Sequence, residues 1–167
     1  MSRKAVSPMY DDFRELCRTL FRFLEEEYGF RVTEEKSDVF GSYITYRNTT
    51  TAVIISFEPR EGGVFIRLYR LVDGKIPDYP VFVHPDTQLN MFYLDTLLEV
   101  RVPSLHVEQD PKEMAKPSLS KLKEVLQQYA ALLHLYANDI LRGDFKVFED
   151  LETIVKKRAE EIRRQKR

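Results

Sequence analysis

The longest periodic stretch of the chain, residues 118–148, limits the possible folds more than any other part of the sequence. Its apolar residues recur at steps of three and four, and this spacing places them on one face of a helix. They are Leu119, Leu122, Val125, Leu126, Tyr129, Leu133, Tyr136, Ala137 and Ile140. Charged and amide side chains occupy most of the positions between them, as in a helix that lies on a hydrophobic core.

The ends of this helix are marked by residues with known terminal preferences. The hydroxyl of either Ser118 or Ser120 can accept a hydrogen bond from a free N–H group of the first turn. Gly143 ends the helix, because glycine adopts the left-handed conformation of a helix end without steric cost. Asp144 can then cap a second helix, so the sequence predicts a C-terminal helical hairpin broken at residues 142–144. Two side chains of the second helix are expected to turn back toward the first: Phe145 and Phe148.

Length and composition indicate one domain, residues 1–167. With 43% apolar and 32% charged side chains, 167 residues suffice for one core and are too few for two. The net charge of −1 gives no overall attraction to nucleic acid or to an anionic membrane. The single cysteine, Cys17, excludes an internal disulfide framework and fits a reducing compartment. No segment approaches the roughly 18 apolar residues of a membrane span, so we expect a soluble, cytoplasmic protein without membrane contact.

A second helix is predicted near the N-terminus. Ser7 followed by Pro8 is typical of a helix start, and Gly29 marks its end. Apolar residues between these two signals again fall at helical spacing: Met9, Phe13, Leu16, Cys17, Leu20 and Leu24. This helix is expected to pack with the longer one.

Between residues 30 and 76 the apolar period changes to two, which indicates strands. Four segments rich in β-branched and aromatic residues are separated by turn sequences: 31–36, 41–47, 51–58 and 64–72. Their connections are too short for helical crossovers, so the sheet must be an antiparallel meander of about four strands. Together with the helices, which are expected to cover one face of the sheet, this predicts an α+β fold.

The alternation assigns the strand residues to two faces. The face expected under the helices carries Val53, Ile55, Phe57, Val64, Ile66 and Leu68. The opposite face carries Phe65, Arg67 and Tyr69, with Tyr43 and Thr45 as further candidates. Aromatic and arginine residues are enriched in the cores of protein interfaces. We therefore expect a binding surface at Phe65, Arg67 and Tyr69.

Residues 76–117 are irregular and contain most of the prolines. Within them only residues 90–101 have helical spacing, enough for a helix of about three turns. Long loops without structure of their own are often binding sites. Residues 77–84, with Tyr79 and His84, are therefore a second candidate for the binding surface.

No catalytic, metal or cofactor site is predicted. The histidines are His84, His106 and His134. None has another histidine or a cysteine at metal-ligand spacing, and Cys17 falls at a core position of its helix. One alternative stays open, a hydrolase-like enzyme in which a loop histidine works with a nearby carboxylate. The groups available to it are His84 or His106 with Asp86, Glu108 or Asp110.

Residues 156–167 form a basic tail whose end can fray. It contains seven Lys or Arg and two Glu, which leaves a charge of −6 on residues 1–155. Residues at four-residue steps alternate in sign, as in an exposed helix with weak ion pairs: Glu152, Lys156, Glu160 and Arg164. Weak nucleic-acid binding through this helix is a further alternative. Because the negative charge of residues 1–155 repels phosphate groups, nucleic acid is not expected as the partner.

Residues 136–151, YANDILRGDFKVFEDL, resemble a segment of small uncharacterised bacterial proteins, in which a helix ending in L-x-G-D-F is followed by F-x-x-L. The resemblance covers about a tenth of the chain directly. An N-terminal pattern fits less specifically: Phe13, Leu16, Leu20, Phe23 and Leu24. Some such proteins are similar to immunity proteins, which neutralise a toxin by occupying its active site. The resemblance implies a protein partner and no catalytic residues.

The combined expectation is a non-enzymatic protein-binding module of bacterial type, with the immunity- or inhibitor-like role that the resemblance implies. The expected partner is another protein or a second copy of the chain in a homodimer, and no cofactor is expected.

Overall fold

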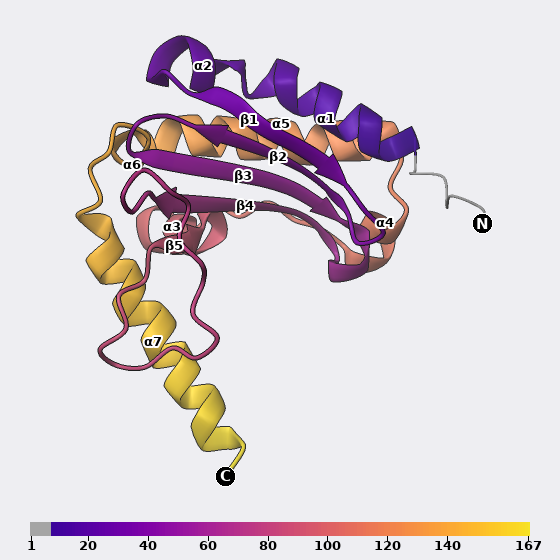
Figure 1. The fold of residues 1–167 in the computed structure, drawn as a ribbon. Coiled ribbons are helices and arrows are strands. Elements are labelled where there is room, and N and C mark those ends of the chain that lie inside the picture. Colours follow the sequence, from indigo (N-terminus) through magenta and orange to yellow (C-terminus); the bar gives the residue numbers. More distant parts are fainter. Residues whose placement is uncertain (1–7) are drawn as a thin grey trace, which may run out of the picture.

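The computed structural model describes residues 8–167 as helices arranged around an antiparallel sheet (Figure 1). The helices are α1 (Pro8–Leu20), α2 (Arg22–Tyr28), α3 (Leu94–Arg101), α4 (Pro111–Ala115), α5 (Leu119–Tyr136), α6 (Asn138–Leu141) and α7 (Val147–Gln165), with a 3-10 turn, η1 (Pro59–Glu61). The strands are β1 (Arg31–Ser37), β2 (Ser42–Arg47), β3 (Thr51–Glu58), β4 (Gly63–Arg70) and β5 (Met91–Tyr93). The predicted α+β class is confirmed.

The N-terminal helix is interrupted where one continuous helix was expected. Phe21 separates α1 from α2 and is fully buried. Gly29 ends α2 as predicted, in the left-handed conformation with a φ of 69°. Ser7, the expected cap at the other end, lies outside the described residues.

The sheet is a meander in which every strand pairs with its neighbours in the sequence, in the order β1-β2-β3-β4-β5. All four pairings are antiparallel, as the short turns predict. The fifth strand was not predicted. Met91–Tyr93 pairs with residues 67–69 of β4, so the helix expected over residues 90–101 begins only at Leu94.

The helices α1, α3 and α5 cover one face of the sheet (Figure 1). Alternate strand residues on this face are almost completely buried: Ile44, Tyr46, Val53, Ile55, Phe57, Val64, Ile66 and Leu68. Their partners from the helices include Phe13, Leu24, Leu97, Leu126 and Leu133. Cys17, which is fully buried in the same core, is confirmed as a core residue, and burial raises the pKa of its thiol.

The signals of the C-terminal helices are confirmed in part: the single helix predicted up to Gly143 is interrupted at Ala137, between α5 and α6, and α7 begins after Lys146 rather than directly after Asp144. The Ser118 hydroxyl accepts a hydrogen bond from the Lys121 N–H at 3.1 Å at the start of α5. Gly143 has a φ of 87°, and the Asp144 carboxylate accepts from the Lys146 N–H at 3.1 Å before α7. A side chain at Gly143 would also lie 2.8 Å from the Thr50 hydroxyl, because the β2–β3 turn packs against this break.

The β2–β3 turn joins the two ends of the helix layer. The Asn48 side-chain amide donates to the Tyr28 carbonyl at the end of α2 and to the Leu141 carbonyl at the end of α6, both at 3.1 Å. The Thr51 hydroxyl, fully buried, donates to the Ile140 carbonyl at 2.9 Å. The turn therefore satisfies helix-end carbonyl groups that have no partner within their own helices.

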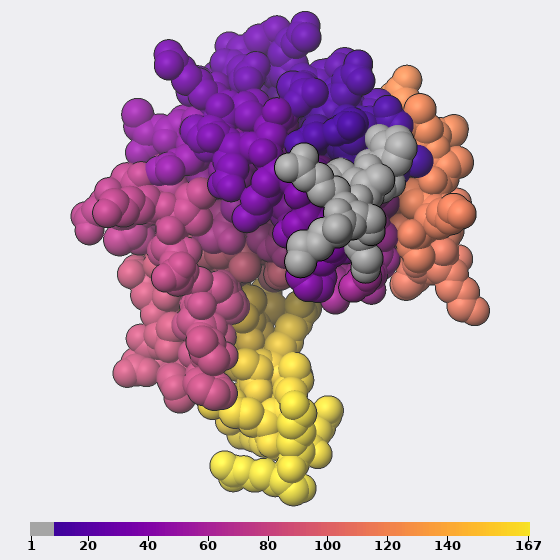
Figure 2. Space-filling model, turned by 45° about the vertical axis from the view of Figure 1, so that its right-hand side comes forward, coloured from indigo at the N-terminus to yellow at the C-terminus, as the bar shows by residue number. Residues whose placement is uncertain are grey.

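The helix α7 does not fold back along α5 as the expected hairpin would. It runs away from α5, packs against α3 and projects from the body of the protein (Figures 1 and 2). Phe148 is buried against the Phe92 ring at 4.8 Å, and Leu151 is also buried, but beyond Val155 the helix is mostly charged. The second half has only one large apolar residue, Ile162, which is 54% exposed, so it has no apolar stripe that would hold it on the core. Among residues 8–167 no helix is both long and apolar enough to cross a membrane.

The loop formed by residues 76–90 lies along the projecting helix (Figure 1). Three hydrogen bonds hold it there. Glu152 accepts from the Leu89 N–H at 2.6 Å, Lys156 donates to the Pro85 carbonyl at 2.7 Å, and Arg163 donates to the Val83 carbonyl at 2.8 Å. We call residues 156–167 together with this loop the arm.

Candidate functional site

The sheet face opposite the helices is divided into a covered end and an open end. At the covered end, Ala52, Tyr69 and Met91 form a small cluster that Leu71 and Ile76 cover. The chain reaches this position because the turn after β4 folds back, and the Gly74 carbonyl accepts a hydrogen bond from Arg47. The protein therefore covers half of its second face with its own chain.

The open end is an open depression of about 710 Å³. It is lined by Phe40, Tyr43, Glu58, Arg60, Glu61, Phe65, Arg67 and Tyr93. These residues come from the β1–β2 turn, from β2, β3, β4 and β5, and from η1. Aromatic rings and arginines thus meet on a rigid sheet, with no helix of the described chain above them.

Arg67 lies at the centre of the open end and is held from three sides. Its guanidinium donates to Glu58 at 3.2 Å and to the Ser56 hydroxyl at 3.0 Å, and lies 5.2 Å from the centre of the Tyr93 ring. Burial acts to lower the pKa of Arg67, but Tyr93 and Glu58 outweigh it and raise the pKa above the ordinary value. Phe65 packs edge-on against the same Tyr93 ring at 6.3 Å. The arginine is therefore charged and fixed in one position.

The rim of the depression is formed by the turn between β1 and β2. The Asp38 carboxylate accepts hydrogen bonds from the Phe40 and Gly41 N–H groups at 2.7 and 3.1 Å, which fixes the turn. It leaves the Phe40 ring 59% exposed. The Arg60 guanidinium lies 5.9 Å from the centre of that ring. A partner at this rim would meet one free aromatic ring and one accessible positive charge.

The structure brings together only part of the predicted binding surface. Phe65 and Arg67 lie side by side at the open end. Tyr69 was expected to be exposed with them, and this expectation is wrong: Tyr69 is 9% exposed, because the turn after β4 covers it. Tyr79 is 42% exposed and is not among the residues that line the depression; burial, together with nearby Tyr93, raises its pKa. His84 lies apart, in the arm beside the Phe82 ring.

Sequence reasoning missed Phe40, Arg60 and Tyr93. Phe40 lies in a turn, and Arg60 lies in the 3-10 turn that follows β3, so neither has a strand period. Tyr93 belongs to the unpredicted β5. The exposure of Phe40 could have been predicted. Its ring lies between Asp38 and Gly41 in a short hairpin turn, where it cannot reach the hydrophobic core.

The histidines do not gather at one place. The His106 ring lies 3.5 Å from Glu108, and both side chains are highly exposed. The His134 ring is 2.7 Å from Glu27 and stacks on Phe23 at 4.4 Å, on the outer side of α5. The pairing of His84 or His106 with a carboxylate in a concave site, which an enzyme would need, is not found in the open end. In residues 8–167 no group of three or more potential metal ligands is found.

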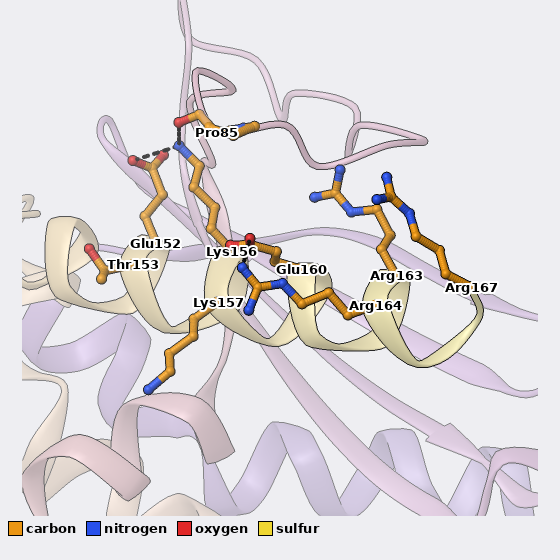
Figure 3. A pocket seen from close by; sticks show the side chains of 9 residues that line it. All are labelled: Pro85, Glu152, Thr153, Lys156, Lys157, Glu160, Arg163, Arg164 and Arg167. Carbon is orange, nitrogen blue, oxygen red and sulfur yellow. Dashed lines mark hydrogen bonds and ion pairs between the residues drawn. The ribbon is translucent and has the colours of Figure 1, made fainter.

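A second depression, of about 870 Å³, runs between α7 and the 76–90 loop (Figure 3). Its lining is Pro85, Glu152, Thr153, Lys156, Lys157, Glu160, Arg163, Arg164 and Arg167. Two of the basic groups are paired within the helix, Lys156 with Glu152 at 3.4 Å and Arg164 with Glu160 at 2.6 Å. The side chains of Arg163 and Arg167 both extend toward the loop (Figure 3).

Comparison of the chain with protein-family models, with curated proteins and with solved structures found no match.

Proposed function

We propose that this protein is a non-enzymatic binding module that holds a protein partner against the open end of its sheet. One observation carries the proposal. The chain covers one sheet face with helices and half of the other with its own turn, yet leaves a rigid patch of aromatic rings and arginines uncovered. Tyr, Phe and Arg are enriched in the cores of protein interfaces, and Tyr and Arg are also enriched among the residues that supply most of the binding energy.

The partner contact uses side chains, because the edges of the sheet are poorly suited to strand addition. The edge strand β5 has only three residues, and at the other edge the pairing of β1 with β2 is irregular between Val32 and Glu34. Charged side chains, Glu34, Glu35 and Lys36, follow the irregularity. Irregular, charged edges of this kind disfavour pairing with another strand. The sheet face, with Phe40 and Arg60 at its rim, is the better surface.

The resemblance of residues 136–151 to small bacterial proteins favours an immunity- or inhibitor-like form of this function, in which binding blocks the partner's active site. Arg60 supplies the charge for an acidic group of that partner. It has only Phe40 as a close aromatic neighbour, and among residues 8–167 no carboxylate forms an ion pair with it.

The test is site-specific photo-crosslinking in the source cell. A photoreactive amino acid in place of Phe40 should form one discrete crosslinked product, whereas the same residue in place of Lys123, exposed on α5, should form none. Arg60→Glu should abolish the product, and the matched charge reversal Lys123→Glu should leave it unchanged. A product of twice the chain mass would identify the partner as a second copy.

Crosslinks from both positions alike, or from neither, would contradict the proposed surface. Both substituted positions are exposed, so loss of folding does not explain such a result.

A further inference from the structure

The arm carries a positive charge that whole-chain averages conceal. Residues 156–167 contain seven Lys or Arg and two Glu, while the 76–90 loop adds only Asp78 and Asp86. Arg158 is paired outside the groove with Glu99. Lys157, Arg163 and Arg167 line the groove without a carboxylate partner among residues 8–167. The groove therefore presents three cationic groups that an anionic ligand can reach.

The negative charge of the body has little effect at the distal half of the arm. With a rise of about 1.5 Å per residue, Arg163 lies about 12 Å along the helix beyond Val155, the last residue that packs on the core. The Debye length is about 8 Å at physiological ionic strength. The projection of α7 thus places Arg163 and Arg167, but not Lys157, more than one screening length beyond the last residue that packs on the core.

The loop beside the groove carries two exposed aromatic side chains, Phe82 and His84, which precede the lining residue Pro85 in the chain. Phe82 is 73% exposed, and the His84 ring lies 6.4 Å from it. The loop presents them beside the helix because Arg163 and Lys156 hold the Val83 and Pro85 carbonyls. Exposed rings in a loop that basic side chains hold by its backbone are a composition with which proteins bind single-stranded nucleic acid, because bases stack on rings while phosphates meet the cations.

We propose that the groove between α7 and the 76–90 loop binds single-stranded nucleic acid without sequence preference. Paired bases in a duplex could not stack on Phe82, and a flat lipid surface would not enter a groove between a helix and a loop. Three phosphate contacts predict a salt dependence of log K of about −2, at about −0.7 per contact. The expected Kd is about 10⁻⁵ M at physiological salt. This site is separate from the open end of the sheet.

Fluorescence anisotropy with a labelled oligouridylate of about 12 nucleotides tests the proposal. Lys157→Gln with Arg167→Gln should weaken binding about tenfold and reduce the salt slope by about 1.4, because two contacts are lost. These two residues do not hold the loop, so the arm stays assembled. Phe82→Ala should weaken binding about fivefold or more with an unchanged salt slope, because only stacking is lost.

The matched control is Lys121→Gln with Lys123→Gln, which removes the same charge from α5 and should leave binding unchanged. An equal loss in this control would show that binding is general electrostatics and would overturn the groove as the site. The proposal also fails if the wild-type protein does not bind at about 50 mM salt. Equal affinity for a duplex of the same length, tighter binding to anionic vesicles, or no effect of Phe82→Ala would likewise overturn it.

Discussion

The two faces of the sheet are built from the same strands, yet they are stabilised in different ways. The helix-covered face is continuous and apolar, and its residues are almost completely buried. The open end of the second face combines half-buried rings with an arginine held by Glu58, Ser56 and Tyr93. Burial fixes the first face, whereas directional polar contacts fix the second. A surface built in the second way can stay rigid and accessible at the same time.

The sharpest test of this contrast compares two phenylalanines on adjacent strands. Phe57→Ala, in the covered core, should lower the free energy of unfolding by about 3–5 kcal/mol, because it leaves a cavity that the packed helices cannot fill. Phe65→Ala should lower the free energy of unfolding by only about 1 kcal/mol, because its ring is partly rather than fully buried. Urea unfolding measures both, and equal losses would remove the distinction between the faces.

A second prediction concerns the polar contacts of the open end. Arg67→Ala should lower the free energy of unfolding by about 2 kcal/mol, since it leaves the Glu58 carboxylate partly buried without its cation. In the double variant with Glu58→Gln, part of that loss should be recovered, because no unpaired charge remains. If the two losses simply add in chemical denaturation, the residues do not act as a pair.

The helix layer also contains one strong ion pair, which predicts a pH dependence. Arg101 donates to both carboxylate oxygens of Asp139, at 2.7 and 2.5 Å, and thereby lowers the pKa of Asp139 below its ordinary value. The ion pair therefore contributes to the free energy of unfolding at pH values above about 4, the pKa of Asp139 in the unfolded chain. This contribution is lost as the pH falls through the lower pKa of Asp139 in the folded protein.

Asp139→Asn should accordingly cost about 1–2 kcal/mol at pH 7. The difference in free energy of unfolding between this variant and the wild-type protein should shrink below pH about 4. Thermal unfolding across this range measures it, and a difference that stays constant would exclude the charge of Asp139 as its cause.

The smallest expected effect belongs to the rim of the open end. Phe40→Ala should change the free energy of unfolding by less than about 0.5 kcal/mol, because the ring is mostly exposed. The same substitution should strongly reduce partner capture if the open end is the binding surface. A stability loss comparable to that of Phe57→Ala would mean that the ring packs in the core instead.

The strand pattern could be predicted because alternation at a period of two is a local property. All four expected strands are found, with β3 at the expected bounds of 51–58. The three residues of β5 are too few to show a period, and their pairing with β4 depends on where the 76–90 loop returns the chain. The covering of Tyr69 depends in the same way on how a turn folds back.

The C-terminal region shows the same limit. Gly143 and Asp144 predict where one helix stops and the next begins, because end signals act within a few residues. They do not predict the direction of α7, which follows from the loss of apolar residues beyond Val155. The net charge of the chain is limited for a related reason, because it averages over groups that the fold places far apart.

The hydrogen bonds of Asn48 and Thr51 to the carbonyls of Leu141 and Ile140 span about ninety positions of the chain. During synthesis on the ribosome, the first strands emerge long before those carbonyls exist. Until residue 141 leaves the exit tunnel, the β2–β3 turn has polar groups without acceptors and a sheet face without its longest helix. Products truncated before that residue should therefore be soluble only with a chaperone, whereas removal of the basic tail should leave translation products that fold.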